Sequence, residues 1–216
     1  MDYKNKPSDY YNKIRQEMLA FLPSNVNKAL DVGCGNGAFA SEIKERTNAE
    51  VWGIELMEEE GKQAEKVLDK VFIGKGEDFI AQLPDNYFDV IYFNDVLEHM
   101  IDPYSVLKQI KQKLTPTGVV ISSIPNIRYH KEFVKMLVLN KEWKYQDQGI
   151  MDFTHMRFFT KKSIERMYKD AGYKIIKHQG INKTKSVMPY IYNIPFLFTQ
   201  GDIFYLQYAT VAGKND

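Results

Sequence analysis

Three glycines at alternate positions interrupt an apolar run near one end of the chain. Residues 29–40 read Ala-Leu-Asp-Val-Gly-Cys-Gly-Asn-Gly-Ala-Phe-Ala, so Gly33, Gly35 and Gly37 follow a short hydrophobic segment and precede a helical pattern. Glycine adopts positive φ and, having no Cβ, lets a ligand lie against the backbone. The free N–H groups and positive dipole end of the next helix would face that ligand. The stretch predicts a buried strand, a tight turn and a helix that together form a ligand site.

An acidic residue distinguishes two kinds of ligand for this turn. Gly33-x-Gly35-x-x-Ala38 also satisfies the dinucleotide fingerprint, and a purely structural turn is a further alternative. Asp31, however, lies two residues before Gly33. A carboxylate there would repel a pyrophosphate and suit a ligand with an ammonium group and no phosphate. S-adenosylmethionine carries a sulfonium, an amino group and a carboxylate, so it is the favoured ligand.

Composition limits the remaining possibilities. The chain has 216 residues, enough for one domain, with 44% hydrophobic and 26% charged residues. A net charge of +1 does not favour nucleic acid or an anionic membrane as a partner. The single cysteine, Cys34, excludes an intrachain disulfide and fits a reducing compartment. We find no signal peptide and no apolar run long enough to span a bilayer, so a cytoplasmic location is expected.

Strand and helix patterns alternate through residues 29–124. Strands are expected at the glycine turn, at 51–56, at 71–73, at 87–93 and at 117–124, with amphipathic helices between them. This order predicts an α/β fold with a doubly wound, mostly parallel sheet, whose ligand lies at the carboxyl ends of the strands. Glu55 ends the second strand about 20 residues after the turn, a spacing typical of an acid that binds ribose hydroxyls.

The flanking segments complete a single domain over residues 1–216. Residues 1–24 are expected to form a helix, and residues 126–160 an insertion, partly helical, that caps the crevice. Strands near 173–177 and 202–211 would close a seven-stranded sheet. The apolar stretch 189–198 is interpreted as core or a dimer contact in preference to a membrane-surface loop, because no basic cluster flanks it.

Several motifs occur in an order that resembles a known family. They are Asp31-Val-Gly-Cys-Gly-Asn-Gly37, Glu55, Phe88-Asp89, Asp95-Val-Leu-Glu-His99 with Asp102-Pro103, and Asp152-x-Thr-His-x-Arg-Phe-Phe-Thr160. Together they resemble the class I S-adenosylmethionine-dependent methyltransferases of the ubiquinone/menaquinone type, and the bacterial branch associated with surface polysaccharide synthesis. The resemblance implies a Rossmann-like methyltransferase fold, S-adenosyl-L-methionine as cofactor, and O-methylation of a sugar or another small metabolite.

Fold and resemblance together give a set of expected cofactor-binding residues. Gly76 and Glu77 follow the third strand, where the family commonly has an acid that contacts the adenine, although Lys75 follows Gly74 directly here. Tyr11 and Arg15 could reach the cofactor's carboxylate from the N-terminal helix. The full set is Tyr11, Arg15, Asp31, Gly33, Gly35, Asn36, Gly37, Glu55, Leu56, Gly76, Glu77, Asn94 and Asp95.

The expected catalytic residues are His155, His99 and Arg157. A sugar hydroxyl needs a general base at neutral pH, and His155 in the inserted segment and His99 after the fourth strand are the two candidates. Asp95, Glu98 and His99 also have helical ligand spacing, but no second ligand group is evident in the sequence, so no metal is expected. A quinone-like phenol or an amine as acceptor, and a non-catalytic cofactor-binding protein, remain alternatives. A homodimer is left open.

Overall fold

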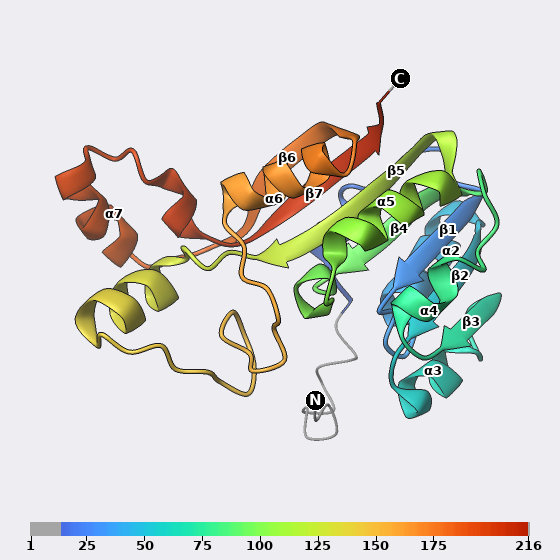
Figure 1. Ribbon diagram of the computed structural model, residues 1–216, viewed down its shortest axis with the longest axis horizontal. Helices are drawn as coiled ribbons and strands as arrows, with labels where there is room; N and C mark the ends of the chain where they lie inside the picture. The colour runs from blue at the N-terminus through green and yellow to red at the C-terminus, as the bar shows by residue number, and fades with distance from the viewer. Residues whose placement is uncertain (1–13, 216) are drawn as a thin grey trace.

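The computed structural model describes residues 14–215, in which a seven-stranded sheet lies between two layers of helices (Figure 1). The strand order is β3-β2-β1-β4-β5-β7-β6, and only β7 runs antiparallel to its neighbours. The strands are β1 (Lys28–Val32), β2 (Glu50–Glu55), β3 (Lys70–Ile73), β4 (Phe88–Asn94), β5 (Leu114–Pro125), β6 (Tyr173–Lys183) and β7 (Tyr205–Lys214). The expected doubly wound, mostly parallel sheet is confirmed.

Helices connect the strands and cover both faces of the sheet. They are α1 (Gln16–Leu19), α2 (Ala38–Thr47), α3 (Glu58–Ala64), α4 (Gly76–Ile80), α5 (Pro103–Lys113), α6 (Lys161–Asp170) and α7 (Met188–Asn193). Short 3₁₀ turns span Leu97–His99, Ile194–Phe196 and Gly201–Phe204, and a π-helix spans Lys131–Leu139. Within the described chain, no helix combines the length and apolarity needed to cross a bilayer.

Local sequence signals set the start of α5 and of α6. Asp102 precedes Pro103 and accepts a hydrogen bond from the Ser105 N–H, so it caps α5. Thr160 and Ser163 form a reciprocal capping box at the start of α6. Both helices therefore begin at a residue whose side chain caps the free N–H groups of the first turn.

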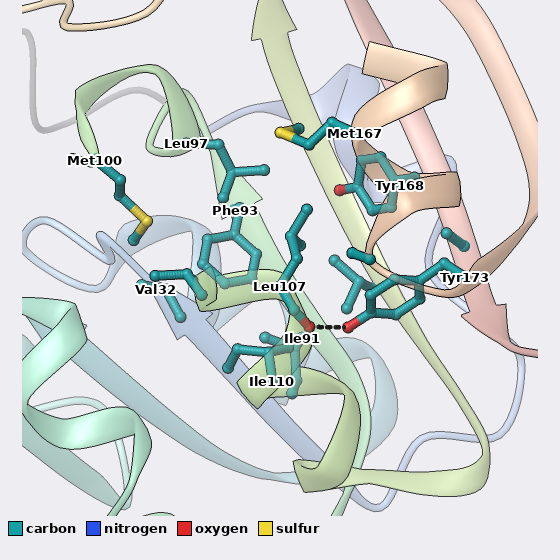
Figure 2. Packing of buried hydrophobic residues seen from close by; sticks show 14 of the residues in the cluster. Val32, Ile91, Phe93, Leu97, Met100, Leu107, Ile110, Met167, Tyr168 and Tyr173 are labelled. Carbon is teal, nitrogen blue, oxygen red and sulfur yellow. Dashed lines mark hydrogen bonds between the residues drawn. The ribbon is translucent and has the colours of Figure 1, made fainter. Parts of the chain in front are cut away.

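The core is divided between the two faces of the sheet. One cluster packs α4, α5 and α6 against the sheet, and Figure 2 shows part of it, including the hydrogen bond that the Tyr173 hydroxyl donates to the Leu107 carbonyl at 2.8 Å. The second cluster packs α1, α2 and α3 against the opposite face. Because helices cover both faces of the sheet, a ligand-binding cleft is expected at the carboxyl ends of the parallel strands.

The segments outside the alternating core differ from expectation. Within the described part of the predicted 1–24 helix, only Gln16–Leu19 is helical, and β7 begins at residue 205 rather than 202 because a 3₁₀ turn precedes it. The stretch 189–198 is largely exposed, so its interpretation as core is wrong for most of its side chains. His130, in the segment 126–160 that the sequence predicts to be partly helical, is buried, and its Nε2 lies 3.3 Å from the Thr184 hydroxyl.

One glycine in the sheet lets the glycine turn pack against β2. A Cβ at Gly53 would lie 2.6 Å from the Cys34 Sγ and 2.9 Å from Leu68 Cδ1, and both side chains are buried. We predict that Gly53→Ala lowers the free energy of unfolding by about 1–3 kcal/mol through overpacking, measured by urea denaturation. Gly201→Ala is the matched control, because no atom lies within 4 Å of its Cβ position. Equal stability of both variants would contradict this packing.

Candidate functional site

A cavity of about 1060 Å³ opens at the carboxyl ends of the central parallel strands. Its volume suits a cofactor together with a small second molecule. Eleven of the predicted site residues line it: Arg15, Asp31, Gly33, Gly35, Glu55, Leu56, Gly76, Glu77, Asn94, Asp95 and His99. Asn36, Gly37, His155 and Arg157 are outside the lining, and Tyr11 falls outside the described residues. The cavity therefore brings together most of the residues that the sequence analysis predicted for the site.

The glycine turn has the backbone conformation that its sequence predicts. Gly33, Gly35 and Gly37 have φ values of 77°, 56° and 86°, all in the left-handed region that favours glycine. The N–H of Gly33 donates to the Ile54 carbonyl at 2.7 Å, which fixes the turn to β2. A Cβ at Gly33 would lie 2.4 Å from a methyl group of Val96, so any other residue at this position would clash with Val96.

Glu55 joins the glycine turn to the end of β2. Its carboxylate accepts hydrogen bonds from the Gly35 N–H at 2.7 Å and from the Met57 N–H at 2.8 Å. Burial raises the pKa of this carboxyl, and the two N–H donors act in the opposite direction. Each carboxylate oxygen can accept more than one hydrogen bond, so capacity remains for a ligand's hydroxyl groups. The predicted contact with ribose stays a prediction.

Asp31 is a buried acid with one unsatisfied oxygen. The residue is 2% exposed, and its Oδ1 has no hydrogen-bond partner among the described residues. Burial, with a smaller contribution from the charge of Glu55, raises the pKa of Asp31 to about 8. The carboxyl is therefore mostly protonated at neutral pH before a ligand binds. This corrects the sequence argument, which treated Asp31 as a negative charge, because that argument did not include desolvation.

Arg15 anchors the N-terminal segment to the cavity. Its guanidinium forms an ion pair with Asp95 and another with Glu17, and it donates to the Gln207 side-chain oxygen at 3.0 Å. Asp95 is held further by the Gln207 amide and the Ser123 hydroxyl, and its φ is 56°. Arg15 lines the cavity as predicted, yet its charge is balanced by two carboxylates of the chain itself.

Asn94 ends β4 beside this ion pair and offers a second unsatisfied polar group. Both the oxygen and the nitrogen of its side-chain amide are buried without a hydrogen-bond partner within the described part of the chain. A buried amide without partners costs free energy, which a ligand's polar groups can recover. Asn94 and Asp31 thus both present unsatisfied polar atoms at the same cavity.

Glu98, His99 and His155 form a cluster next to the cavity, and of the three His99 lines it. One ligand atom from each residue lies within 4.8 Å of the others. His99 and His155 each place Nδ1 against a backbone carbonyl, that of Thr154 at 3.1 Å and that of Ile150 at 2.8 Å. This contact selects the tautomer with a proton on Nδ1, which leaves Nε2 as an acceptor or ligand atom.

Glu98 contributes a buried carboxyl to this cluster. It is 1% exposed, neither of its oxygens has a hydrogen-bond partner among residues 14–215, and its Oε1 lies 4.0 Å from the His155 Nε2. Two imidazoles and one carboxylate are a donor set suited to a divalent transition cation. The sequence grouped Glu98 and His99 with Asp95, whereas the structure groups them with His155 and pairs Asp95 with Arg15.

The inserted segment reaches the cavity through few side chains. Met156 lines it, His155 is buried behind the lining, and Arg157 is exposed and donates to the Ile101 carbonyl at 2.6 Å. The role of Arg157 in catalysis stays a prediction. Asn182, at the end of β6, and Gln207, at the start of β7, line the cavity and were missed by the sequence analysis, because isolated polar residues at strand ends have no distinctive pattern.

Comparisons with known proteins agree on the family. Residues 5–178 match a family model described as a methyltransferase domain. Ubiquinone biosynthesis O-methyltransferase of Aeromonas salmonicida is 30% identical, over 84% of this chain and 78% of the relative. The protein of the same name from Thiobacillus denitrificans is 33% identical, over 77% and 73%.

Solved structures agree on the fold. A SAM-dependent methyltransferase from Archaeoglobus fulgidus superposes with a TM-score of 0.68 at 18% identity, covering 92% of this chain and 90% of that one. The [4+2]-cyclase SpnF has the same fold, with a TM-score of 0.64 at 19% identity, covering 99% and 85%. The fold alone therefore does not define the reaction, whereas the family match shows a methyltransferase. This chain belongs to the class I S-adenosyl-L-methionine-dependent methyltransferases.

Proposed function

We propose that the protein transfers a methyl group from S-adenosyl-L-methionine to a hydroxyl group of a small phenolic acceptor, catechol-like or quinol-like. The observation that carries the proposal is the Glu98–His99–His155 cluster beside the cofactor cavity, since it can deprotonate or coordinate a hydroxyl. The printed name of the sequence relatives, ubiquinone biosynthesis O-methyltransferase, supports a hydroxyl acceptor of this kind.

The residues around the glycine turn fit the cofactor. Asp31 and Asn94 offer unsatisfied polar atoms for an amino-acid group, Glu55 offers acceptors for ribose hydroxyls, and the backbone of Gly33 and Gly35 lines the cavity in the left-handed conformation. The bound cofactor supplies a methyl group on a positively charged sulfur. The chain's own contribution is to hold the acceptor oxygen in line with that methyl group, which is worth up to about 7–11 kcal/mol.

The wall next to His99 favours a flat apolar acceptor. This part of the cavity is lined by Val96, Met100, Ile101 and Met156. None of these side chains can form the hydrogen bonds that a sugar hydroxyl loses when it leaves water. An aromatic ring loses little hydration on packing against such side chains. A sugar of surface polysaccharide or secondary metabolism is the second candidate, because the amides of Asn182 and Gln207 also line the cavity.

We further propose that Glu98, His99 and His155 hold a divalent cation. Two nitrogen donors suit Mn²⁺ or Zn²⁺ better than Mg²⁺, which prefers oxygen ligands. Such a cation lowers the pKa of a coordinated hydroxyl. The carbonyls of Thr154 and Ile150 orient the two imidazoles, and burial of Glu98 keeps water from its carboxyl. Without a cation, His99 is the base with access to the cavity.

Binding of the cofactor should depend on pH through Asp31. A cationic amino group binds the ionised carboxyl, so below the pKa of about 8 the ligand must displace a proton. We expect the Kd for S-adenosylmethionine to rise about tenfold per pH unit between pH 8 and 6, measured by isothermal titration. Asp31→Asn should abolish this slope. A Kd for the wild type that does not vary with pH would contradict the role of Asp31.

Removal of the cation ligands should lower the rate without loss of cofactor binding. Glu98→Gln should abolish binding of Mn²⁺ or Zn²⁺ in a calorimetric titration and reduce methyl transfer by more than about tenfold, the lower bound for loss of a supporting partner of a metal ligand. Glu59→Gln, at an exposed acid on α3, is the control. Full activity of the wild type after chelation, with no binding of either cation, would refute the cation site.

The acceptor class can be tested directly by mass spectrometry. We expect a gain of one methyl group with catechols or hydroquinones and none with nucleotide sugars. Met156→Gln keeps the size of the side chain and removes apolar surface, so it should raise KM for the phenol by about tenfold while leaving the Kd of the cofactor unchanged. Turnover of a sugar, with no turnover of a phenol, would select the second candidate and contradict the first.

A further inference from the structure

Residues 186–201 form an ordered protrusion between β6 and β7, which we name the tip. They contain α7 and a 3₁₀ turn, and in Figure 1 they lie at one end of the long axis, away from the sheet. Asn193 closes the tip, because its side-chain amide donates to the Gln200 carbonyl and accepts from the Gln200 N–H, both at 3.0 Å. Asn193 is 1% exposed. The residues between these two positions are thus held outward by a buried clamp.

The clamp turns apolar side chains toward solvent. Leu197 is 84% exposed, Phe198 61% and Ile194 58%, and Ile191 and Phe196 are also more than half exposed. Leu197 and Phe198 have φ values of 50° and 60°, a conformation that is unfavourable for both residue types. Two large apolar side chains exposed by such a conformation mark a candidate contact surface.

The charge pattern indicates which surface that is. Residues 186–201 contain no charged side chain, and Lys183 and Lys185 precede them. The acid that follows, Asp202, is already paired with Arg128 at 2.5 Å. The chain next to the tip is therefore basic, and the Lys183 ammonium lies 5.5 Å from the centre of the Phe204 ring. Apolar side chains next to lysines match the boundary between acyl chains and anionic headgroups of a bilayer.

The shape of the tip also favours a bilayer over a protein partner. A stable protein interface buries about 800 Å² on each partner, over a broad complementary surface. An interfacial anchor needs only a few apolar side chains that enter the headgroup region by about 5–10 Å. A protrusion with several apolar side chains more than half exposed, Leu197 and Phe198 among them, suits the second kind of contact.

We propose that residues 186–201 dock the protein reversibly on an anionic lipid surface, with Leu197 and Phe198 in the headgroup region and Lys183 and Lys185 beside the phosphates. This inference goes beyond the proposed function, since it concerns where the protein binds and does not depend on the methyl acceptor. It also revises the sequence interpretation, which disfavoured a membrane-surface loop for lack of a basic cluster.

The test uses the full chain and vesicles of phosphatidylcholine with or without phosphatidylglycerol. We expect cosedimentation with the anionic vesicles that falls as salt is raised, and weak binding to neutral vesicles. Leu197→Asn with Phe198→Asn should reduce binding by about tenfold or more. Asparagine tolerates the left-handed backbone, so the double variant keeps the tip's conformation. Its melting temperature and cofactor affinity should equal those of the wild type.

Control variants distinguish lipid binding by the tip from general surface apolarity and from dimer formation. Ile176→Asn removes an equally exposed apolar side chain on β6 and should leave vesicle binding unchanged. Lys183→Gln with Lys185→Gln should weaken binding to anionic vesicles only. The proposal is overturned if the wild type binds neither vesicle or binds both equally. It is also overturned if sedimentation without lipid shows a dimer that the Leu197→Asn, Phe198→Asn variant converts to a monomer, since a second copy would then cover the tip.

Discussion

The hydrogen bond from the Gly35 N–H to the Glu55 carboxylate ties the glycine turn to the neighbouring strand, and the rest of the cavity depends on that connection. The turn can approach β2 only because glycine occupies its left-handed positions and because Gly53 leaves space for Cys34. Asp31 lies directly behind the turn, so the approach that forms the cavity also removes water from this acid. The packing of the glycine turn against β2 thus both forms the cavity and raises the pKa of Asp31.

Much of the cofactor end could be predicted from local sequence, because each signal acts within a few residues. The glycines require positive φ, Asp102–Pro103 and Thr160 with Ser163 cap helices, and strands alternating with helices fix the edge where Asp31, Glu55 and Asn94 meet. The protonation state of Asp31 could not be predicted in this way, because desolvation depends on every group packed around the carboxyl.

The acceptor end was less predictable because it joins residues far apart in the chain. Helical spacing grouped Asp95 with Glu98 and His99, yet Leu97–His99 is a single 3₁₀ turn and Asp95 has a left-handed backbone, so that spacing does not apply. Asp95 pairs with Arg15 instead, and His155 comes from the irregular segment between the π-helix Lys131–Leu139 and α6, 56 residues after His99. The exposed tip was missed for a related reason, since an apolar run does not reveal whether the fold covers it.

The account depends on a cavity that accepts a cationic adenosyl compound and rejects a phosphorylated dinucleotide. Isothermal titration of the purified protein with S-adenosylmethionine and, separately, with NAD tests this most directly. We expect saturable binding of S-adenosylmethionine at one site per chain, because Asp31 can ionise to pair with its ammonium group, and no binding of NAD, because the Gly35 N–H that could bind a pyrophosphate already donates to Glu55. Tight binding of NAD, or no binding of S-adenosylmethionine, would contradict it.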